Sequence, residues 1–211
     1  MLGTNILDKF RREPGKSAIC AQSHYEKGVL LAEQNLYPEA LVELKQAIRA
    51  EPDFSEARLE LGVTYHKMGR INQAIKTYLE ALENRSDLVK AYKNLGVAYD
   101  SLGDFVKALK MYCKAIRLDP NDPELRNDLG MAYFNIGSYA EAIKAYHQAL
   151  QIFPNNGRAH YCLGLVYLDL EDKGSALEEQ SILEKLNQDE LASQLLHEID
   201  RQTLRASATE T

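Results

Sequence analysis

The chain has 211 residues, of which 45% are hydrophobic and 27% charged, and its formal net charge at pH 7 is -6. This length and apolar content are enough to bury a sizeable core, whereas the acidic balance argues against a general nucleic-acid-binding protein, which is normally basic. No run reaches the roughly 18 consecutive apolar residues of a membrane span, and residues 1–16 lack the apolar stretch of a secretory signal.

The N-terminal extension, predicted as residues 1–16, begins with four apolar side chains at helical spacing, after which the Glu-Pro-Gly sequence at 13–15 interrupts the pattern. It is therefore either a frayed segment or a short amphipathic helix. A helix of about twelve residues is marginal in water by itself, so it would have to dock on the segment that follows, on a neighbouring molecule or on a membrane surface. The four apolar residues are Leu2, Ile6, Leu7 and Phe10.

From residue 21 onward, small and aromatic residues recur with a period of 34. The clearest copy is 89–122, and moving the frame by one period in either direction brings the same residue types into register. Such a repeat indicates a stack of helix pairs, each of which buries its apolar face against its neighbours. In the clearest copy the recurring residues are Tyr92, Leu95, Gly96, Tyr99, Gly103, Ala108, Tyr112, Ala115 and Pro120.

These offsets resemble those of the tetratricopeptide repeat (TPR) proteins, whose unit is a helix–turn–helix of about 34 residues with small residues at positions 8, 20 and 27. The resemblance implies an all-α fold, a right-handed TPR α-solenoid of antiparallel helix pairs in residues 17–190. The glycine at position 8 is expected where the two helices of a repeat come closest. The five repeats are predicted at 21–54, 55–88, 89–122, 123–156 and 157–190.

Repeat five departs from the pattern, because Glu171 replaces the turn glycine and Gln180 replaces the aromatic residue. Residues 191–204 then carry one apolar stripe and a charged back, which is what a solenoid needs to close its open end. We predict a C-terminal capping helix over these residues and a disordered tail over residues 205–211.

The sequence contains no recognisable catalytic or metal-binding constellation. The five histidines are scattered, and packed or surface roles are favoured for them over ligand roles. Cys20, Cys113 and Cys162 are odd in number and have no His or Cys neighbours at metal-ligand spacing, which favours reduced structural thiols. We therefore expect a cytoplasmic protein that is not an enzyme and has no metal and no cofactor.

In the TPR family the first helix of each repeat lines a concave groove, mainly through positions 2, 5, 9, 12 and 13. Position 9 is apolar in every repeat here, and several large apolar side chains should gather in the C-terminal half of the groove. Such an exposed cluster usually marks a partner site, although the same residues could pack on one another or on the final helix as core. The candidate partner-binding residues are Val63, Lys93, Val97, Asn127, Met131, Phe134, Tyr161, Leu165 and Leu168.

Position 2 alternates in charge from the second repeat onward. This pattern favours a self-neutralising ladder between neighbouring helices, each pair worth less than about 1 kcal/mol, although a groove for a partner of mixed charge also fits. The Lys and Asn clamp with which some TPR domains hold acidic chaperone tails is incomplete in both possible frames. The residues at position 2 are Gln22, Glu56, Lys90, Glu124 and Arg158.

The predicted function is a non-catalytic scaffold or adaptor that presents its groove to a peptide segment or helix of another protein. We expect the partner to be a protein or peptide, with no nucleic acid. The alternative is self-assembly, in which the N-terminal segment or a terminal repeat of one copy docks on a neighbouring copy to give a homo-oligomer. A concentration-dependent size that is lost on deleting residues 1–16 would favour this alternative.

Overall fold

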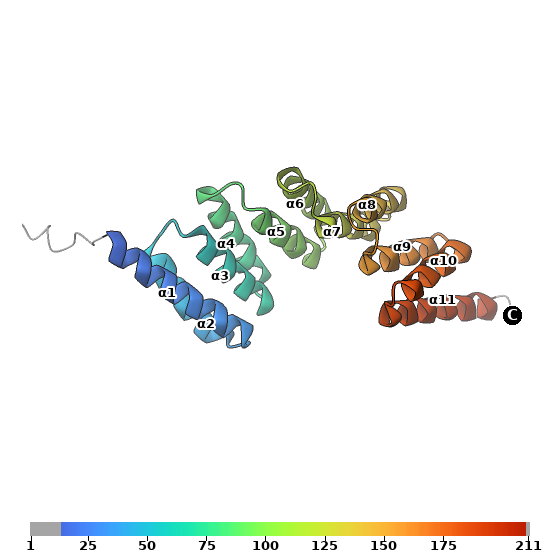
Figure 1. Ribbon diagram of the computed structural model, residues 1–211, viewed down its shortest axis with the longest axis horizontal. Helices are drawn as coiled ribbons and strands as arrows, with labels where there is room; N and C mark the ends of the chain where they lie inside the picture. Colours follow the sequence, from blue (N-terminus) through green and yellow to red (C-terminus); the bar gives the residue numbers. More distant parts are fainter. Residues whose placement is uncertain (1–13, 210–211) are drawn as a thin grey trace, which may run out of the picture. The chain divides into compact units, whose positions relative to one another are not determined.

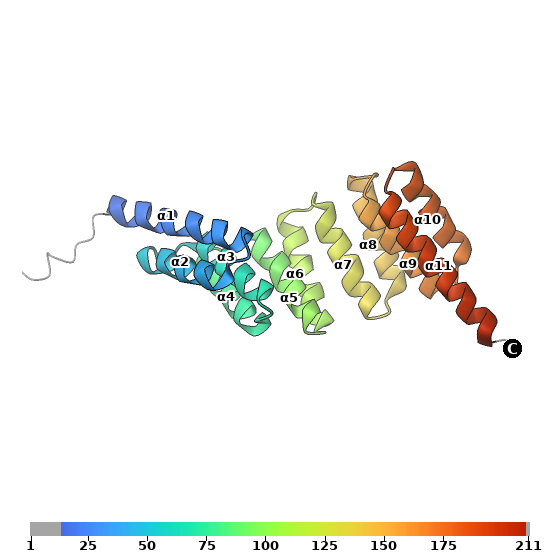
Figure 2. The same cartoon turned by 90° about the horizontal axis from the view of Figure 1, so that it is seen from below.

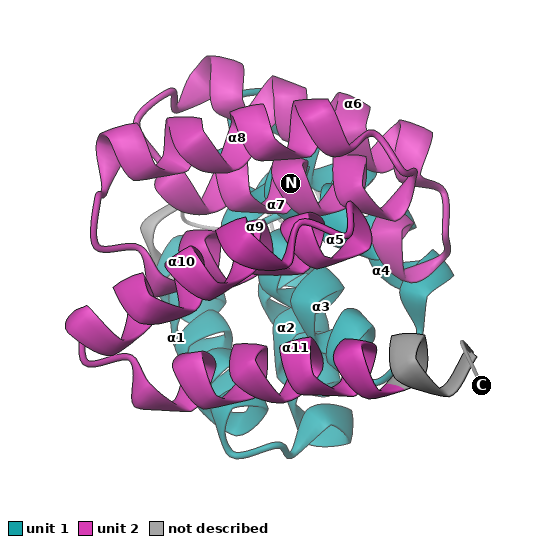
Figure 3. Ribbon diagram, turned by 90° about the vertical axis from the view of Figure 1, so that its right-hand side faces the viewer, with its two compact units in different colours: residues 1–98 teal, residues 99–211 magenta. Residues whose placement is uncertain are grey.

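The computed structural model describes residues 14–209, and the side chains of residues 18–204, and this part of the chain contains eleven helices and no strand. The chain divides into two units, residues 1–98 and 99–211, and the division falls inside the fifth helix (Figure 3). The all-α fold predicted from the sequence is confirmed. Residues 1–12, for which the sequence left open a frayed segment or a short amphipathic helix, lie outside the described residues.

The first unit is built from antiparallel helices joined by short turns, with α1 packed on α2 and α3 packed on α4 (Figure 1). Its core consists of small, aliphatic and aromatic side chains, such as Ala40 and Leu44 on α2 and Ala74 and Tyr78 on α4. Its helices are α1 (Pro14–Glu33), α2 (Tyr37–Ala50), α3 (Ser55–Lys67), α4 (Ile71–Asn84) and α5 (Val89–Ser101), whose last turn belongs to the second unit.

The second unit continues the pattern of helix pairs and ends in three helices that lie side by side (Figure 2). The first helices of repeats two to five begin at the residues predicted from the period, Ser55, Val89, Pro123 and Gly157. The helices of the second unit are α6 (Phe105–Leu118), α7 (Pro123–Asn135), α8 (Tyr139–Ile152), α9 (Gly157–Asp169), α10 (Lys173–Lys185) and α11 (Asp189–Thr209).

Close approach of the paired helices explains the glycine at position 8. A Cβ atom on Gly130 would lie 2.6 Å from Cε1 of Tyr146, a fully buried ring on the second helix of the same repeat. Real Cβ atoms do not come this close to an aromatic ring, and the ring cannot move in a packed core. The predicted packing role of this glycine is therefore confirmed for the repeat that contains α7 and α8.

Repeat five keeps the turn geometry of the other repeats although its turn residue is not glycine. Gly103 and Gly137 have φ angles of 73° and 75°, and Glu171, at the same repeat position, has a φ of 61°. A side chain in this left-handed region costs about 1–3 kcal/mol of backbone strain, which the surrounding packing must offset. The docking of α10 on α9 therefore fixes the turn without help from the local sequence.

The C-terminal helix is longer than predicted. Helix α11 begins at Asp189 and ends at Thr209, so residues 205–209, which were predicted to be disordered, are helical. The sequence here contains alanine and no glycine or proline, so nothing in it stops a helix that has already formed. At the N-terminus, α1 begins at Pro14 rather than at residue 17.

Helix α11 closes the end of the second unit and replaces the missing aromatic residue of repeat five. Its Leu195 is fully buried together with Leu183 and Ile199. A Cβ atom on Gly164 would lie 2.9 Å from Cδ1 of Leu195, whereas the equivalent glycine of repeat four faces the tyrosine of its own second helix. Because Gln180 cannot fill this space as an aromatic ring would, a side chain from α11 fills it.

His160 is buried at the contact between α9 and α10 and is paired with a carboxylate. Its Nδ1 lies 2.6 Å from Oε2 of Glu179, and its Nε2 lies 3.1 Å from the carbonyl oxygen of Pro154. Acceptors at both ring nitrogens favour the doubly protonated imidazolium, so the hydrogen bond to Glu179 raises the pKa of His160 despite its burial. Its packed position agrees with the role predicted from the sequence.

This pair makes a testable prediction about stability and pH. Because the pKa of His160 is higher in the folded than in the unfolded chain, its contribution to stability is complete below the unfolded value of about 6.5. The contribution is lost as the pH rises through the folded pKa. We expect His160→Gln to flatten the fall in the free energy of unfolding as the pH rises above about 6.5, measured by urea unfolding at a series of pH values, with the exposed His147→Gln as the control.

Candidate partner-binding surface

A hollow of about 240 Å³ lies between α7, α9 and α11 in the second unit. Its walls include three of the predicted partner-binding residues, Phe134, Leu165 and Leu168. Three of the large apolar side chains that were expected to gather in the C-terminal half of the groove thus lie close together. The remaining lining residues are Asp169, Glu198, Arg201 and Gln202.

The polar side of this hollow is held by local hydrogen bonds. Nη2 of Arg201 lies 2.5 Å from Oε2 of Glu198, and Nε2 of Gln202 donates to the carbonyl oxygen of Leu168 at 2.7 Å. Asp169 accepts a hydrogen bond from the hydroxyl of Tyr139 at 3.2 Å. The hollow thus has an apolar side on α7 and α9 and an ordered polar side, mostly on α11.

The contribution of α11 to this surface was missed by the sequence prediction. The apolar stripe of residues 191–199 predicts a capping helix, but it does not say which side of α9 the helix covers. Within the described part of the chain, α11 contacts α9 as well as α10. Polar side chains of α11 therefore become part of the surface formed by the first helices of the repeats, which we call the first-helix face. The repeat pattern assigns no residue of α11 to this surface.

Leu168 is a core residue rather than an accessible contact, because only 5% of it is exposed. Tyr161 and Leu165 are partly buried and pack against the same core cluster, which includes Leu195 and Ile199 of α11. The interpretation left open in the sequence, that these residues pack on the final helix, therefore applies to Leu168 in full and to Tyr161 and Leu165 in part.

Tyr161 also lines a second, wider hollow of about 440 Å³ with residues of α11, among them His197 and Glu198. Met131 and Phe134 are partly buried and pack against the neighbouring core cluster around Tyr146 and Leu163. The ring of Phe134 lies 5.9 Å from that of Tyr139. Phe134 thus combines a fixed position with an exposed part in the smaller hollow.

Asn127, a predicted groove residue, is fully buried. Its Nδ2 donates to Oε1 of Glu124 at 3.4 Å, and the same oxygen accepts from Nδ2 of Asn156 at 3.3 Å. The side chain of Asn156 also accepts from the backbone N–H of Ala159 and so caps α9. The turn before α9 therefore covers Asn127, and this residue belongs to the scaffold rather than to the partner surface.

The predicted charge ladder is present between repeats four and five. Nη1 of Arg158 donates to Glu124, and Nη2 donates to Asp128, each at 2.8 Å. Glu56, by contrast, forms its ion pair with Arg85, at the end of α4, rather than with the residue one period later. The interpretation as a self-neutralising ladder therefore holds for Glu124 and Arg158, and Asp128 adds a second carboxylate partner for Arg158.

The three candidates in the first unit, Val63, Lys93 and Val97, are partly exposed. The hollow on this unit's first-helix side, about 330 Å³, is lined by neighbouring residues instead, including Tyr25, Glu60 and Lys90. Burial raises the pKa of Glu60, and the charge of Lys90 opposes this effect. The six other candidates lie in the second unit, so no single hollow gathers all nine.

The described residues show no group of His, Cys, Asp and Glu side chains that could hold a metal ion. None of the described helices is long and apolar enough to cross a membrane. Cys162 is buried, Cys113 is partly buried, and Cys20 is exposed, and all three are free thiols.

Comparison with family models gave three matches. A model described as TPR repeat matches residues 28–69 and 132–170, and two models described as Tetratricopeptide repeat match residues 53–121 and 111–144. Together they span the chain from repeat one to the first helix of repeat five. No match was found among curated proteins.

Solved structures similar to this chain include several of MamA. A "Crystal structure of MamA protein" is 26% identical with a TM-score of 0.67, covering 83% of this chain and 93% of that one. The structure "MamA 41-end from Desulfovibrio magneticus RS-1" is 21% identical with a TM-score of 0.73, covering 80% and 96%. A further "Crystal structure of MamA" is 24% identical with a TM-score of 0.70, covering 77% and 95%. The likeness extends over nearly the whole of those chains and supports the helix-pair fold.

Proposed function

The chain belongs to the tetratricopeptide repeat proteins, and from this we propose that it is a non-catalytic scaffold that binds a peptide segment or helix of another protein. The observation that carries this proposal is the hollow beside Phe134 and Leu165, on the first-helix face of the second unit. The walls of this hollow are formed by two repeat helices and the capping helix, so it exists before any partner arrives. Little ordering cost then falls on the scaffold.

The size of the hollow favours a side chain of a partner protein over a free small molecule. Its volume of about 240 Å³ is below the roughly 300–1,000 Å³ of typical small-molecule sites. An apolar side bordered by satisfied polar groups is also how protein interfaces are organised around an anchor residue. We propose that a large apolar side chain of the partner enters the hollow and contacts Phe134 and Leu165.

The proposed contact residues are fewer than the sequence suggested. In the second unit they are Met131, Phe134, Tyr161 and Leu165, all of which are partly exposed. In the first unit, Val63, Lys93 and Val97 stay candidates for contacts with the same partner or with another. Asn127 and Leu168 are excluded because they are buried.

The test is a capture experiment from native cell extract with the full chain as bait. Phe134→Ser and Met131→Ser remove apolar contact area without introducing a charge into a half-buried position. Because hot-spot truncations typically cost about 2 kcal/mol or more, we expect the double variant to retain about a tenth or less of the captured partner. The affinity of the purified partner for both baits then gives the loss in binding directly.

The matched control is Ile136→Ser with Leu118→Ser, which removes two apolar side chains that are 42% and 44% exposed and do not line the hollow. Circular dichroism and urea unfolding must show that all baits are equally helical and similarly stable. Equal capture by the Phe134 and Met131 variant and by the wild-type chain would rule out the second-unit surface as the binding site.

A further inference from the structure

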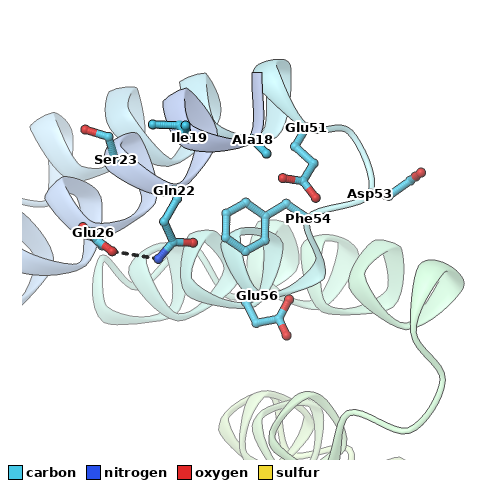
Figure 4. A pocket seen from close by; sticks show the side chains of 9 residues that line it. All are labelled: Ala18, Ile19, Gln22, Ser23, Glu26, Glu51, Asp53, Phe54 and Glu56. Carbon is cyan, nitrogen blue, oxygen red and sulfur yellow. Dashed lines mark hydrogen bonds between the residues drawn. The ribbon is translucent and has the colours of Figure 1, made fainter. Parts of the chain in front are cut away.

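Another hollow lies in the first unit and is not used by the proposed function. It has a volume of about 590 Å³ and lies between the beginning of α1, the α2–α3 turn and the beginning of α3. In Figure 4 the ring of Phe54 stands at its centre, with Ala18 and Gln22 of α1 on one side and Glu56 on the other. The ring of Phe54 also packs against that of Tyr25, with the two ring centroids 5.0 Å apart.

The surface of this hollow is apolar in the middle and acidic around it. Ile19 is 73% exposed and lines the hollow together with Phe54, so the two side chains offer an apolar surface that a partner segment could cover. Glu26, Glu51, Asp53 and Glu56 surround the two apolar groups, and none of the described residues that line the hollow is basic.

Only part of this negative charge is neutralised within the first unit. Glu56 forms an ion pair with Arg85, whereas Glu26 only accepts a hydrogen bond from the neutral amide of Gln22, at 2.8 Å. No ion pair is found for Glu51 or Asp53 among the described residues. A segment that carries both apolar and basic side chains would therefore bury Ile19 and Phe54 and compensate the carboxylates.

We propose that this segment is the N-terminal extension of the same chain, residues 1–12, folded back on the beginning of α1 and α3. Its composition complements the hollow, since the four apolar residues identified above are accompanied by three basic residues and one acidic residue. The basic residues are Lys9, Arg11 and Arg12.

The length of the chain allows this contact within one molecule. Ile19 lies five residues into α1, about 8 Å along the helix axis from Pro14 at the rise of an α-helix. The four residues from Phe10 to Pro14 span up to about 13 Å when extended, so Phe10 can reach Ile19. A tether this short gives the segment a millimolar effective concentration at the hollow, which favours its own chain over a second copy. The inference does not depend on the partner surface near Phe134.

The test is hydrogen exchange of the full chain followed by mass spectrometry. In the wild-type chain we expect the amides of residues 2–12 to exchange about tenfold more slowly than in a variant with Glu51→Lys and Asp53→Lys. The rate should not depend on protein concentration. A further variant adds the opposite charge changes in the segment, Lys9→Glu, Arg11→Glu and Arg12→Glu, to the Glu51 and Asp53 variant. Because the charges are then complementary again, slow exchange of residues 2–12 should return.

The control variant reverses two exposed carboxylates elsewhere, Glu83→Lys and Glu178→Lys, and should exchange like the wild-type chain. Equally fast exchange of residues 2–12 in the wild-type chain and in the Glu51 and Asp53 variant would overturn the proposal. Slow exchange that persists in that variant would place the segment elsewhere. Slow exchange that disappears on dilution would identify the occupant as a second copy.

Discussion

Leu195→Ala should lower the free energy of unfolding by about 3 kcal/mol, as expected when a fully buried leucine is truncated and leaves a cavity. Leu195 is completely buried and belongs to the core cluster that joins α11 to α9 and α10. The loss should appear in urea unfolding followed by circular dichroism. The neighbouring Leu196→Ala serves as the control and should cost less than about 1 kcal/mol, because Leu196 is 39% exposed.

Gly164 gives a second way to test the same contact. Gly164→Ala by itself should destabilise the chain by about 1–3 kcal/mol, because the new methyl group would overlap the Leu195 side chain. In the double variant, Gly164→Ala with Leu195→Ala, the new methyl group enters the space that the leucine side chain has vacated. The double variant should therefore lose about 1 kcal/mol less free energy of unfolding than the sum of the losses of the two single variants. Simple additivity would mean that Leu195 does not fill the space beside Gly164.

The repeat period predicted the helices well because each repeat carries its own packing signals. In repeats one, two and four a glycine at position 8 faces a large side chain on the second helix of the same repeat, as Gly130 faces Tyr146. Alanine at position 20 is fully buried in every repeat, as at Ala74 and Ala142. These signals lie within one repeat, so the sequence alone is sufficient to place the helix pairs.

The partner surface was harder to predict because it depends on what the next element covers. Position 5 was assigned to the groove, but Asn127 at that position is buried beneath the turn before α9. Leu168 was assigned to the groove as well, but it lies in the core that α11 completes. Neither burial follows from the position of the residue within its repeat, because each depends on a segment outside the helix that carries the residue.

The acidic hollow at the beginning of α1 was missed for a related reason. Its residues come from three segments, around Ile19, Asp53 and Glu56, and occupy different repeat positions. A search by repeat position separates them, and only the folded first unit brings them together. The sequence offered the N-terminal segment as a candidate amphipathic helix, but it gave no sign of the acidic hollow.

The charge pairing between repeats four and five leads to the last expected result. Arg158→Ala should lower the free energy of unfolding by about 2–3 kcal/mol, near the lower end for removing one member of a buried pair. The reason is Asp128, whose side chain is only 7% exposed and accepts from Nη2 of Arg158. Glu124, the other acceptor, is 42% exposed, so Glu124→Gln should cost less than about 1 kcal/mol, as exposed ion pairs usually do.

Two further variants decide whether the buried carboxylate is the source of the effect. Arg158→Lys keeps the charge but cannot bond both acceptors with a planar fork, so it should recover only part of the loss. Asp128→Asn removes the buried charge, and in its presence Arg158→Ala should cost about 1 kcal/mol less than in the wild-type chain. If urea unfolding instead shows that Arg158→Ala and Glu124→Gln lower the free energy of unfolding by the same small amount, the buried Asp128 does not contribute, and only the exposed ion pair with Glu124 remains. A larger cost for Arg158→Ala would show that the contact between repeats four and five depends on burying Asp128 together with its guanidinium partner.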